Sequence, residues 1–323
     1  MRRAIVTGAT GFVGANLAGR LAAEGHQVHL LVRPGYNSWR IERLIEHVRL
    51  HSVDLADIDA LQHTIARISP EWVFHLAVYG AYPGQTVVRT MVQTNIMGTL
   101  NLIEASARAG AEVIVNTGSS SEYGFKDRAP GESDCAEPNS AYAVTKLSAT
   151  LLCRELARRS GVRIPTLRLY SVYGPFEEPT RLIPRLLVRA LDGRLPPLAD
   201  PRTCRDFVYV DDVVDAYLRV AGQRQTDPGA IFNVGTGVQT SLAAIVDSVR
   251  RMLPVEDTPE WGTYADRAWD THTWVADSTR IQRDLGWLPR SGLDEGLRAF
   301  VAWLQAHPEY LRRYRQEQSV VGG

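Results

Sequence analysis

Residues 4–14 read Ala4-Ile-Val-Thr-Gly8-Ala-Thr-Gly11-Phe-Val-Gly14, and this stretch decides the fold of the chain. Its first four residues have the pattern of a short buried strand, and an amphipathic helix is predicted from its last glycine to about Glu24. This order suits a dinucleotide site, because glycines let the backbone approach a pyrophosphate and a helix N-terminus offers free N–H groups. The spacing is G-x-x-G-x-x-G, and a plain tight turn is the alternative interpretation.

Outward from this stretch, strand and helix patterns alternate. Strands are predicted at 27–32, 48–53, 72–77 and 112–117, and helices at 57–68, 86–109 and 140–160. The alternation predicts an α/β fold, a Rossmann-type doubly wound parallel sheet. Beyond Arg168 proline and glycine become frequent, which predicts a smaller C-terminal substrate lobe. We expect a dinucleotide-binding domain over 1–168 with returns near 205–237, the substrate lobe over 169–318, and a flexible tail at 319–323.

The composition excludes several classes of partner. The chain has 323 residues, of which 45% are hydrophobic, as in an ordinary soluble globular protein. Basic and acidic residues number 36 each, so no net field favours nucleic acid or an anionic membrane. No apolar stretch could span a bilayer and no signal peptide is evident, so we expect a cytoplasmic protein without a membrane partner. The 3 cysteines lack metal-ligand spacing, and no metal site is expected.

The end of the second predicted strand bears on the choice of cofactor. An acidic residue at this point would bond the ribose 2′-hydroxyl of NAD, whereas an arginine accommodates the 2′-phosphate of NADP. This chain has Val32 and then Arg33, which favours NADP(H) over NAD(H). A solvated loop charge is the alternative for Arg33. Asp54 and Leu55, at the end of the third predicted strand, are expected near the adenine.

A proton-transfer site is predicted between residues 116 and 146. Tyr142 and Lys146 are one helical turn apart, and a nearby ammonium favours the phenolate, so the lysine could bring the phenol into working range. Ser119, Ser120 and Ser121 follow a predicted strand, and one of them could hold a substrate oxygen beside the tyrosine hydroxyl. A helix with an ordinary surface tyrosine and lysine is the alternative interpretation.

Seven motifs in this order resemble the nucleotide-sugar branch of the extended short-chain dehydrogenase/reductase family. They are Thr7-Gly8-x-x-Gly11-x-x-Gly14, His75-Leu-Ala77, Asn95-Ile-Met-Gly98, Tyr142-x-x-x-Lys146, Arg168-Leu-Tyr-Ser-Val-Tyr-Gly174, Arg205-Asp-Phe207 and Asn233-Val-Gly-Thr-Gly237. The resemblance covers nearly the whole chain. It implies that the partner is a nucleotide-diphosphate sugar and that the protein is a homodimer, packed through helices near residues 86–109 and 140–160.

The resemblance also implies roles for individual residues. Ser119, Tyr142 and Lys146 would be catalytic, with the tyrosine as acid and base and the lysine on the nicotinamide ribose. The implied cofactor-binding residues are Gly8, Gly11, Phe12, Val13, Gly14, Arg33, Asp54, Leu55, Leu76, Ala77, Asn95, Thr117, Lys146 and Tyr170. The implied substrate-binding residues are Tyr79, Ser120, Ser121, Ser171, Arg181, Arg205 and Arg267. The usual Arg-x-Gly-Asp is Arg267-Ala-Trp-Asp270 here, a departure from the family pattern.

The residues after Ser119 narrow the reaction. Family 4,6-dehydratases carry an Asp-Glu pair where this chain has Ser120 and Ser121, and a hydroxyl is a poor acid or base for eliminating water. The run Gly118–Gly124 is similar to that of 4-keto-6-deoxyhexose reductases, and a stoichiometric reductant pairs naturally with NADP. We therefore expect an NADPH-dependent reductase of a 4-keto nucleotide sugar with Tyr142 as proton donor. The alternatives are an NAD-dependent 4-epimerase and, more remotely, a non-catalytic dinucleotide-sensing protein.

Overall fold

The computed structural model describes residues 1–82, 84–223, 227–263 and 273–321. A seven-stranded parallel sheet forms its centre, with strand order β10-β6-β5-β4-β1-β2-β3. Its strands are β1 (Arg3–Thr7), β2 (Gln27–Val32), β3 (Arg49–Ser52), β4 (Trp72–His75), β5 (Val113–Ser119), β6 (Thr166–Leu169) and β10 (Ile231–Val234). The predicted doubly wound α/β fold is confirmed. Within the described ranges no helix is long and apolar enough to cross a membrane.

Both faces of the sheet are buried. Neighbouring residues of a strand point to opposite faces, and in these strands the residues on each face are apolar. In β1, Ala4 and Val6 belong to one core and Ile5 to the other. The first core includes residues of α1 (Phe12–Ala23) and α7 (Val210–Gly222), and the second those of α2 (Ile58–Ile68), α4 (Gly98–Arg108) and α5 (Ala141–Ser160). This double cover is the physical reason that the strands read as short apolar runs.

The long helix predicted at 86–109 is interrupted. It consists of α3 (Val88–Met91), a π-helical turn η2 (Val92–Met97) and α4. Such turns widen a helix locally and are frequent at functional sites. Asn95 lies in this turn and is 2% exposed, which places a polar side chain inside the molecule.

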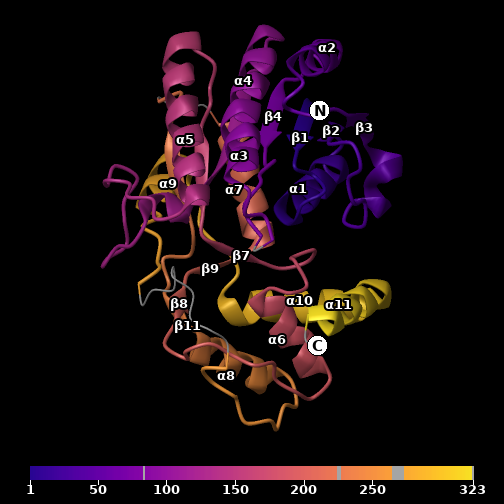
Figure 1. Cartoon of the computed structure of the whole chain (residues 1–323), viewed down its shortest axis with the longest axis vertical. Coiled ribbons are helices and arrows are strands. Elements are labelled where there is room, and N and C mark those ends of the chain that lie inside the picture. The colour runs from indigo at the N-terminus through magenta and orange to yellow at the C-terminus, as the bar shows by residue number, and fades with distance from the viewer. Residues whose placement is uncertain (83, 224–226, 264–272, 322–323) are drawn as a thin grey trace.

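The second lobe has a core of its own, built on α6 (Leu182–Leu191), α8 (Leu242–Met252), α10 (Leu293–Ala306) and α11 (Pro308–Val321). Figure 1 shows this lobe below the sheet. Two small sheets, β7 (Ser171–Tyr173) with β9 (Phe207–Tyr209) and β8 (Cys204–Arg205) with β11 (Thr240–Ser241), lie outside the main sheet. Only β10 returns to the main sheet as a strand, whereas 204–209 does not. The predicted tail at 319–323 begins inside α11, which continues to Val321.

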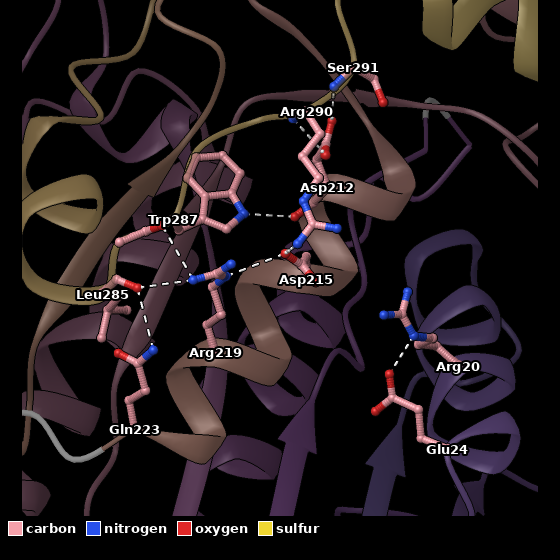
Figure 2. Close-up of polar contacts among 11 residues, drawn as sticks. Arg20, Glu24, Asp212, Asp215, Arg219, Gln223, Leu285, Trp287, Arg290 and Ser291 are labelled. Carbon is pink, nitrogen blue, oxygen red and sulfur yellow. Dashed lines mark hydrogen bonds and ion pairs between the residues drawn. The ribbon is translucent and has the colours of Figure 1, made fainter.

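The lobes are also joined by the segment after α9 (Thr279–Leu285), which folds back onto α7. Figure 2 shows Asp212 at the start of α7 accepting N–H groups from Arg290 (2.9 Å) and Ser291 (3.1 Å), while its carbonyl oxygen accepts Trp287 Nε1–H (2.9 Å). Trp287 is fully buried in the core under α7. The Leu285-Gly-Trp287 motif therefore attaches the segment that leads into α10 to α7.

Candidate active site

The glycine loop between β1 and α1 lies at the carboxyl edge of the sheet and is closely packed. Gly8 has a φ of +68°, and a Cβ atom there would lie 2.4 Å from the carbonyl carbon of Leu76. A Cβ atom on Gly14 would lie 2.3 Å from the carbonyl oxygen of Gly8. α1 has Gly11 as its N-cap, without a side-chain capping bond, and no acidic side chain in its first turn. Its first N–H groups, at Phe12 and Val13, are thus suited to an anion.

The other expected cofactor residues follow the ends of neighbouring parallel strands, so the fold brings them to one edge. Arg33 follows β2 and is exposed. Asp54 and Leu55 follow β3, and the Asp54 carboxylate accepts the Ala56 N–H at 2.9 Å. Leu76 and Ala77 follow β4, where both N–H groups reach Thr7 Oγ at 3.2 Å. The strand ends therefore bring these residues to one edge of the sheet, and their contact with a dinucleotide stays a prediction.

Arg40 is one of the cations near this edge that the fold buries. It is 8% exposed and lies with its guanidinium carbon 4.2 Å from the Trp39 ring centroid. Its Nε donates to the carbonyl oxygen of Phe176 at 2.7 Å, and it pairs with Glu178 at 3.1 Å. Because these partners belong to the second lobe, Arg40 joins the two lobes beside the glycine loop.

His75, at the end of β4, is a buried neutral side chain whose tautomer follows from its partners. Thr99 Oγ donates to the carbonyl oxygen of Asn95 at 2.7 Å, so it must accept from His75 Nε2, 2.8 Å away. His75 Nδ1 then accepts from Thr7 Oγ, also at 2.8 Å. Burial lowers the pKa of His75 to about 3, in keeping with this neutral form. The network fixes β4 against β1 at the cleft, a role that the sequence reasoning missed.

Asn95 connects three elements of the site. Its side-chain oxygen accepts the Tyr79 N–H (2.9 Å), and its amide nitrogen donates to the Tyr79 carbonyl (2.8 Å) and to Thr145 Oγ (2.9 Å). Thr145 belongs to α5, between Tyr142 and Lys146. Asn95 thus ties the loop after β4, which carries Tyr79, to the helix of the proposed acid and base.

Tyr142 and Ser119 lie together, as predicted. The Ser119 side chain lies near enough to the Tyr142 hydroxyl to act on its pKa as a hydrogen-bond partner. Ser119 Oγ lies 2.8 Å from Ser121 Oγ and accepts the Ser121 N–H at 3.2 Å. Burial raises the pKa of Tyr142 from 10.0 to about 12, and the hydrogen bond from Ser119 acts in the opposite direction. The phenol is therefore protonated at neutral pH in this form of the protein and can donate a proton.

Lys146 was expected to act on Tyr142, but its hydrogen-bond partner is a backbone carbonyl group. Its ammonium donates to the carbonyl oxygen of Thr117 at the end of β5. Burial lowers the pKa of Lys146, while the negative charge of Glu122 opposes that change. The expectation that Lys146 would hold the pKa of Tyr142 below its usual value is wrong for this form of the protein, because burial of the phenol outweighs the charges around it. Only the spacing of the pair could be predicted from the sequence.

Glu122 is a second residue that the sequence reasoning missed. Its carboxylate is fully buried, and it accepts the Ser119 N–H and Arg168 Nε–H, both at 2.8 Å. The signal in the sequence was an acidic residue in the turn after a strand, with an arginine inside a buried strand, Thr166–Leu169. Such charges are seldom fully buried unless they are paired.

The predicted substrate residues are distributed around this centre. Arg181 donates to the carbonyl oxygen of Ala81 at 3.0 Å, and its charge reaches Tyr142. Ser120 and Tyr170 line a cavity of about 10 Å³ next to Trp274, and the buried Tyr170 hydroxyl has no hydrogen-bond partner among the described residues. Ser171 begins β7. Arg205 lies with its guanidinium carbon 5.3 Å from the Trp274 ring centroid. The predicted Arg267 lies outside the described residues.

Comparison with known proteins identifies the family. Residues 4–235 match the model of the "NAD dependent epimerase/dehydratase family". The chain is 33% identical over 316 residues to a UDP-glucose 4-epimerase of Mycolicibacterium smegmatis, covering 91% of this chain and 96% of that protein. It is 29% identical over 315 residues to a dTDP-glucose 4,6-dehydratase of Streptomyces griseus, covering 94% of each.

Two solved structures are also similar. One is MoeE5 in complex with UDP-glucuronic acid and NAD, with a TM-score of 0.79, 32% identity, and coverage of 94% of this chain and 99% of that one. The other is UDP-glucose 4-epimerase of Thermotoga maritima with UDP-glucose, with a TM-score of 0.84, 25% identity, and coverage of 94% and 98%. Given a family match over residues 4–235 and a relative 33% identical over nearly the whole length, the chain belongs to the NAD dependent epimerase/dehydratase family, whose members include nucleotide-sugar epimerases and dehydratases.

Proposed function

We propose that the protein is an NAD-dependent 4-epimerase of a UDP-hexose or UDP-hexuronic acid. The observation that carries the proposal is the Tyr142 hydroxyl beside the Ser119 side chain, at the carboxyl end of β5. Such a pair can take a proton from a sugar hydroxyl and return it. The relatives above support the choice of substrate, since they are named for UDP-glucose and UDP-glucuronic acid and the solved MoeE5 holds NAD.

The residues present fit a dinucleotide. The glycine loop leaves no room for a Cβ atom at Gly8 or Gly14, and the uncapped start of α1 offers N–H groups to a diphosphate. Lys146 and Thr117 would hold the nicotinamide half, and Asp54 and Leu55 would lie near the adenine. The dinucleotide, when bound, supplies the hydride acceptor and donor that inversion at C4 requires.

The chain's own residues then move the proton. As a phenolate, Tyr142 would take the proton of the sugar 4-hydroxyl, and as a phenol it would return that proton to the keto oxygen after the sugar has turned. Ser119 Oγ would hold the same oxygen.

Dehydration is not proposed, although a dehydratase is among the relatives. It needs an acid and a base beside C5 and C6 of the sugar, and Ser120 and Ser121 occupy the two positions after Ser119. The nearest carboxylate along the chain, Glu122, is occupied by the Ser119 N–H and by Arg168. The side chain of Glu122 is fully buried and is not accessible to a substrate.

The NADP preference and the ketoreductase that the sequence favoured remain predictions, which one experiment can test. The purified protein is denatured and the released dinucleotide is identified. Bound NAD, with conversion of UDP-glucose or UDP-glucuronic acid to its C4 epimer, would support the proposal. A protein that retains no dinucleotide and oxidises NADPH only when a 4-keto nucleotide sugar is added would overturn it in favour of the reductase.

A tyrosine variant tests the role of the phenol. Tyr142→Phe removes only the hydroxyl, so cofactor binding should persist while kcat falls by roughly two to four orders of magnitude. Turnover is followed by separating the two epimers, and cofactor binding by the dinucleotide released on denaturation. Unchanged turnover would exclude Tyr142 as the acid and base.

We also propose that the protein is a homodimer. Large apolar side chains are exposed on neighbouring helices, namely Val88 (52%), Val92 (40%) and Met97 (41%) on the α3–η2 stretch, and Val144 (48%) and Leu151 (53%) on α5. Figure 1 shows α3, α4 and α5 alongside one another at one side of the sheet. This apolar helix face fits the same face of a second copy.

A further inference from the structure

Glu122 and Arg168 form a buried ion pair beside the proposed active site. Their side chains are 0% and 3% exposed, and Glu122 Oε2 lies 2.8 Å from Arg168 Nε. Glu122 is part of η3 (Ser120–Tyr123), the 3₁₀ turn after β5, and Arg168 is part of β6. Burying two charges is costly even when they are paired, so the pair calls for an explanation other than stability.

The pair holds the backbone of Ser119. Glu122 Oε1 accepts the Ser119 N–H at 2.8 Å, and a Cβ atom on Gly118 would lie 2.8 Å from the same oxygen. Ser119 is the N-cap of η3 and forms a capping box with Glu122. The carboxylate therefore fixes the conformation from which Ser119 Oγ reaches Tyr142.

The other side of the pair is anchored to the second half of the sheet. The Arg168 guanidinium carbon lies 4.4 Å from the Tyr123 ring centroid, and the Tyr123 hydroxyl donates to Asn233 Oδ1 at 2.7 Å. Asn233 belongs to β10, the edge strand next to β6. The contacts among η3, β6 and β10 thus fix the position of the Glu122 carboxylate.

The charge of Glu122 also acts on the groups that would transfer protons. The ionisable groups that face it are Arg168 on β6, Tyr142, Lys146 and Cys153 on α5, and Tyr123 beside it in η3. Its negative charge raises the pKa of Tyr142 and that of Lys146. In both groups the charge of Glu122 favours the protonated form.

We propose that Glu122 is a positioning residue of this site: held by Arg168, it fixes Ser119 against Tyr142 and places a buried negative charge beside the phenol. The inference rests on the proposed function, because it concerns the same proton transfer. Glu122 does not itself touch the substrate, so its effect passes through Ser119 and Tyr142.

The first test is the pH profile of Glu122→Gln, with Glu132→Gln as the matched control. Glu132 is a nearby carboxylate that accepts the Asn233 N–H at 2.8 Å and does not bond Ser119. In Glu122→Gln, kcat should fall roughly ten- to hundredfold through misplacement of Ser119, and the tyrosine ionisation should move to lower pH because a negative charge is lost. In Glu132→Gln the ionisation should not move. An unmoved profile in Glu122→Gln would overturn the inference.

The second test uses Glu122→Asp, which keeps the charge and also serves if Glu122→Gln does not fold. Its shorter side chain cannot reach both partners, so kcat should fall while the ionisation stays in place. In a protein that already carries Ser119→Ala, Glu122→Asp should lower kcat little further, because its effect on kcat passes through Ser119. Fully additive losses would mean that Glu122 does not act through Ser119.

A readout besides turnover separates this inference from the proposed function. If the wild-type protein does not epimerise UDP-sugars, the proposed function fails, and the Tyr142 titration can still be measured. The tyrosinate absorbance that disappears in Tyr142→Phe reports this residue, and its midpoint should be lower in Glu122→Gln than in the wild type. Equal midpoints would contradict the inference whatever the reaction.

Discussion

Glu177 is a single residue whose surroundings disfavour its charge. It follows β7 at the junction of the two lobes, is 8% exposed, and its Oε2 has no hydrogen-bond partner among the described residues. Burial raises the pKa of Glu177 to about 8, against the opposing charges of Arg181 and Arg40. The carboxyl is therefore protonated at neutral pH in the native state.

This makes folding stability depend on pH. The folded pKa of about 8 exceeds the 4.5 of an ordinary glutamate in the unfolded chain, so the native state binds the proton more tightly. The contribution is present in full below the unfolded value and is lost as pH rises through the folded value, on the order of 5 kcal/mol in all. Urea unfolding between these limits should show stability decreasing with pH, and Glu177→Gln should remove much of that slope.

Glu178→Gln is the control for this prediction. Its carboxylate is partly exposed and pairs with Arg40 at 3.1 Å, so it is adjacent in sequence but differently placed. That variant should keep the pH slope of the wild type. If Glu177→Gln kept the same slope as well, another group would have to cause it.

At the scale of elements, α1 depends on a glycine in its first turn and tolerates change at a glycine further along. Gly14→Ala would place a Cβ atom 2.3 Å from the Gly8 carbonyl oxygen, so the loop must move and dinucleotide binding should weaken at least tenfold. Gly19, in the same helix, has only the Leu44 side chain near, at 3.5 Å. Gly19→Ala should leave binding unchanged and raise stability by roughly 0.5–1 kcal/mol. Titration calorimetry and thermal unfolding measure both effects, and equal binding by the two variants would contradict this account of the loop.

The joint between α7 and the 285–291 segment is a second element-scale prediction. Asp212→Ala leaves the part-buried N–H groups of Arg290 and Ser291 and their shared acceptor site unpaired, so stability should fall by roughly 1–3 kcal/mol. Asp215→Asn, one turn further along α7, removes two ion pairs, to Arg219 and Arg290, whose arginines are partly exposed, and should cost at most about 1 kcal/mol. Chemical unfolding compares the two. A loss in Asp215→Asn as large as that in Asp212→Ala would mean that the ion pairs hold the joint.

At the scale of the whole molecule, the apolar helix face predicts the oligomeric state. Leu151→Glu would place one carboxylate from each copy in the two-fold interface. The dissociation constant of the dimer should therefore rise by roughly a hundredfold or more. Leu288→Glu changes an equally exposed leucine, 54% against 53%, that lies outside these helices. Sedimentation should show a dimer for the wild type and for Leu288→Glu, and a monomer for Leu151→Glu. A Leu151→Glu protein of unchanged size would refute this interface.

The fold class was predictable because its signals are local. Apolar runs of strand length, the glycines of residues 8–14 and the alternation of strands with helices each follow from a few neighbouring residues, and the expected strands coincide closely with β1, β2 and β4. The break in the helix at 86–109 was not predictable. The π-helical turn at Asn95 depends on partners far along the chain, Tyr79 and Thr145.

The sequence by itself determined the parallel sheet, the glycine loop and which hydroxyl and amine groups stand near its carboxyl edge, since spacing along the chain decides these. Only the tertiary structure decided the ionisation of the site. The protonated Tyr142, the neutral His75 and the buried pair of Glu122 with Arg168 arise from burial and from contacts between distant segments. The free energy of a charge depends on how much water surrounds it and on which other charges lie near, and no local pattern of residues specifies either.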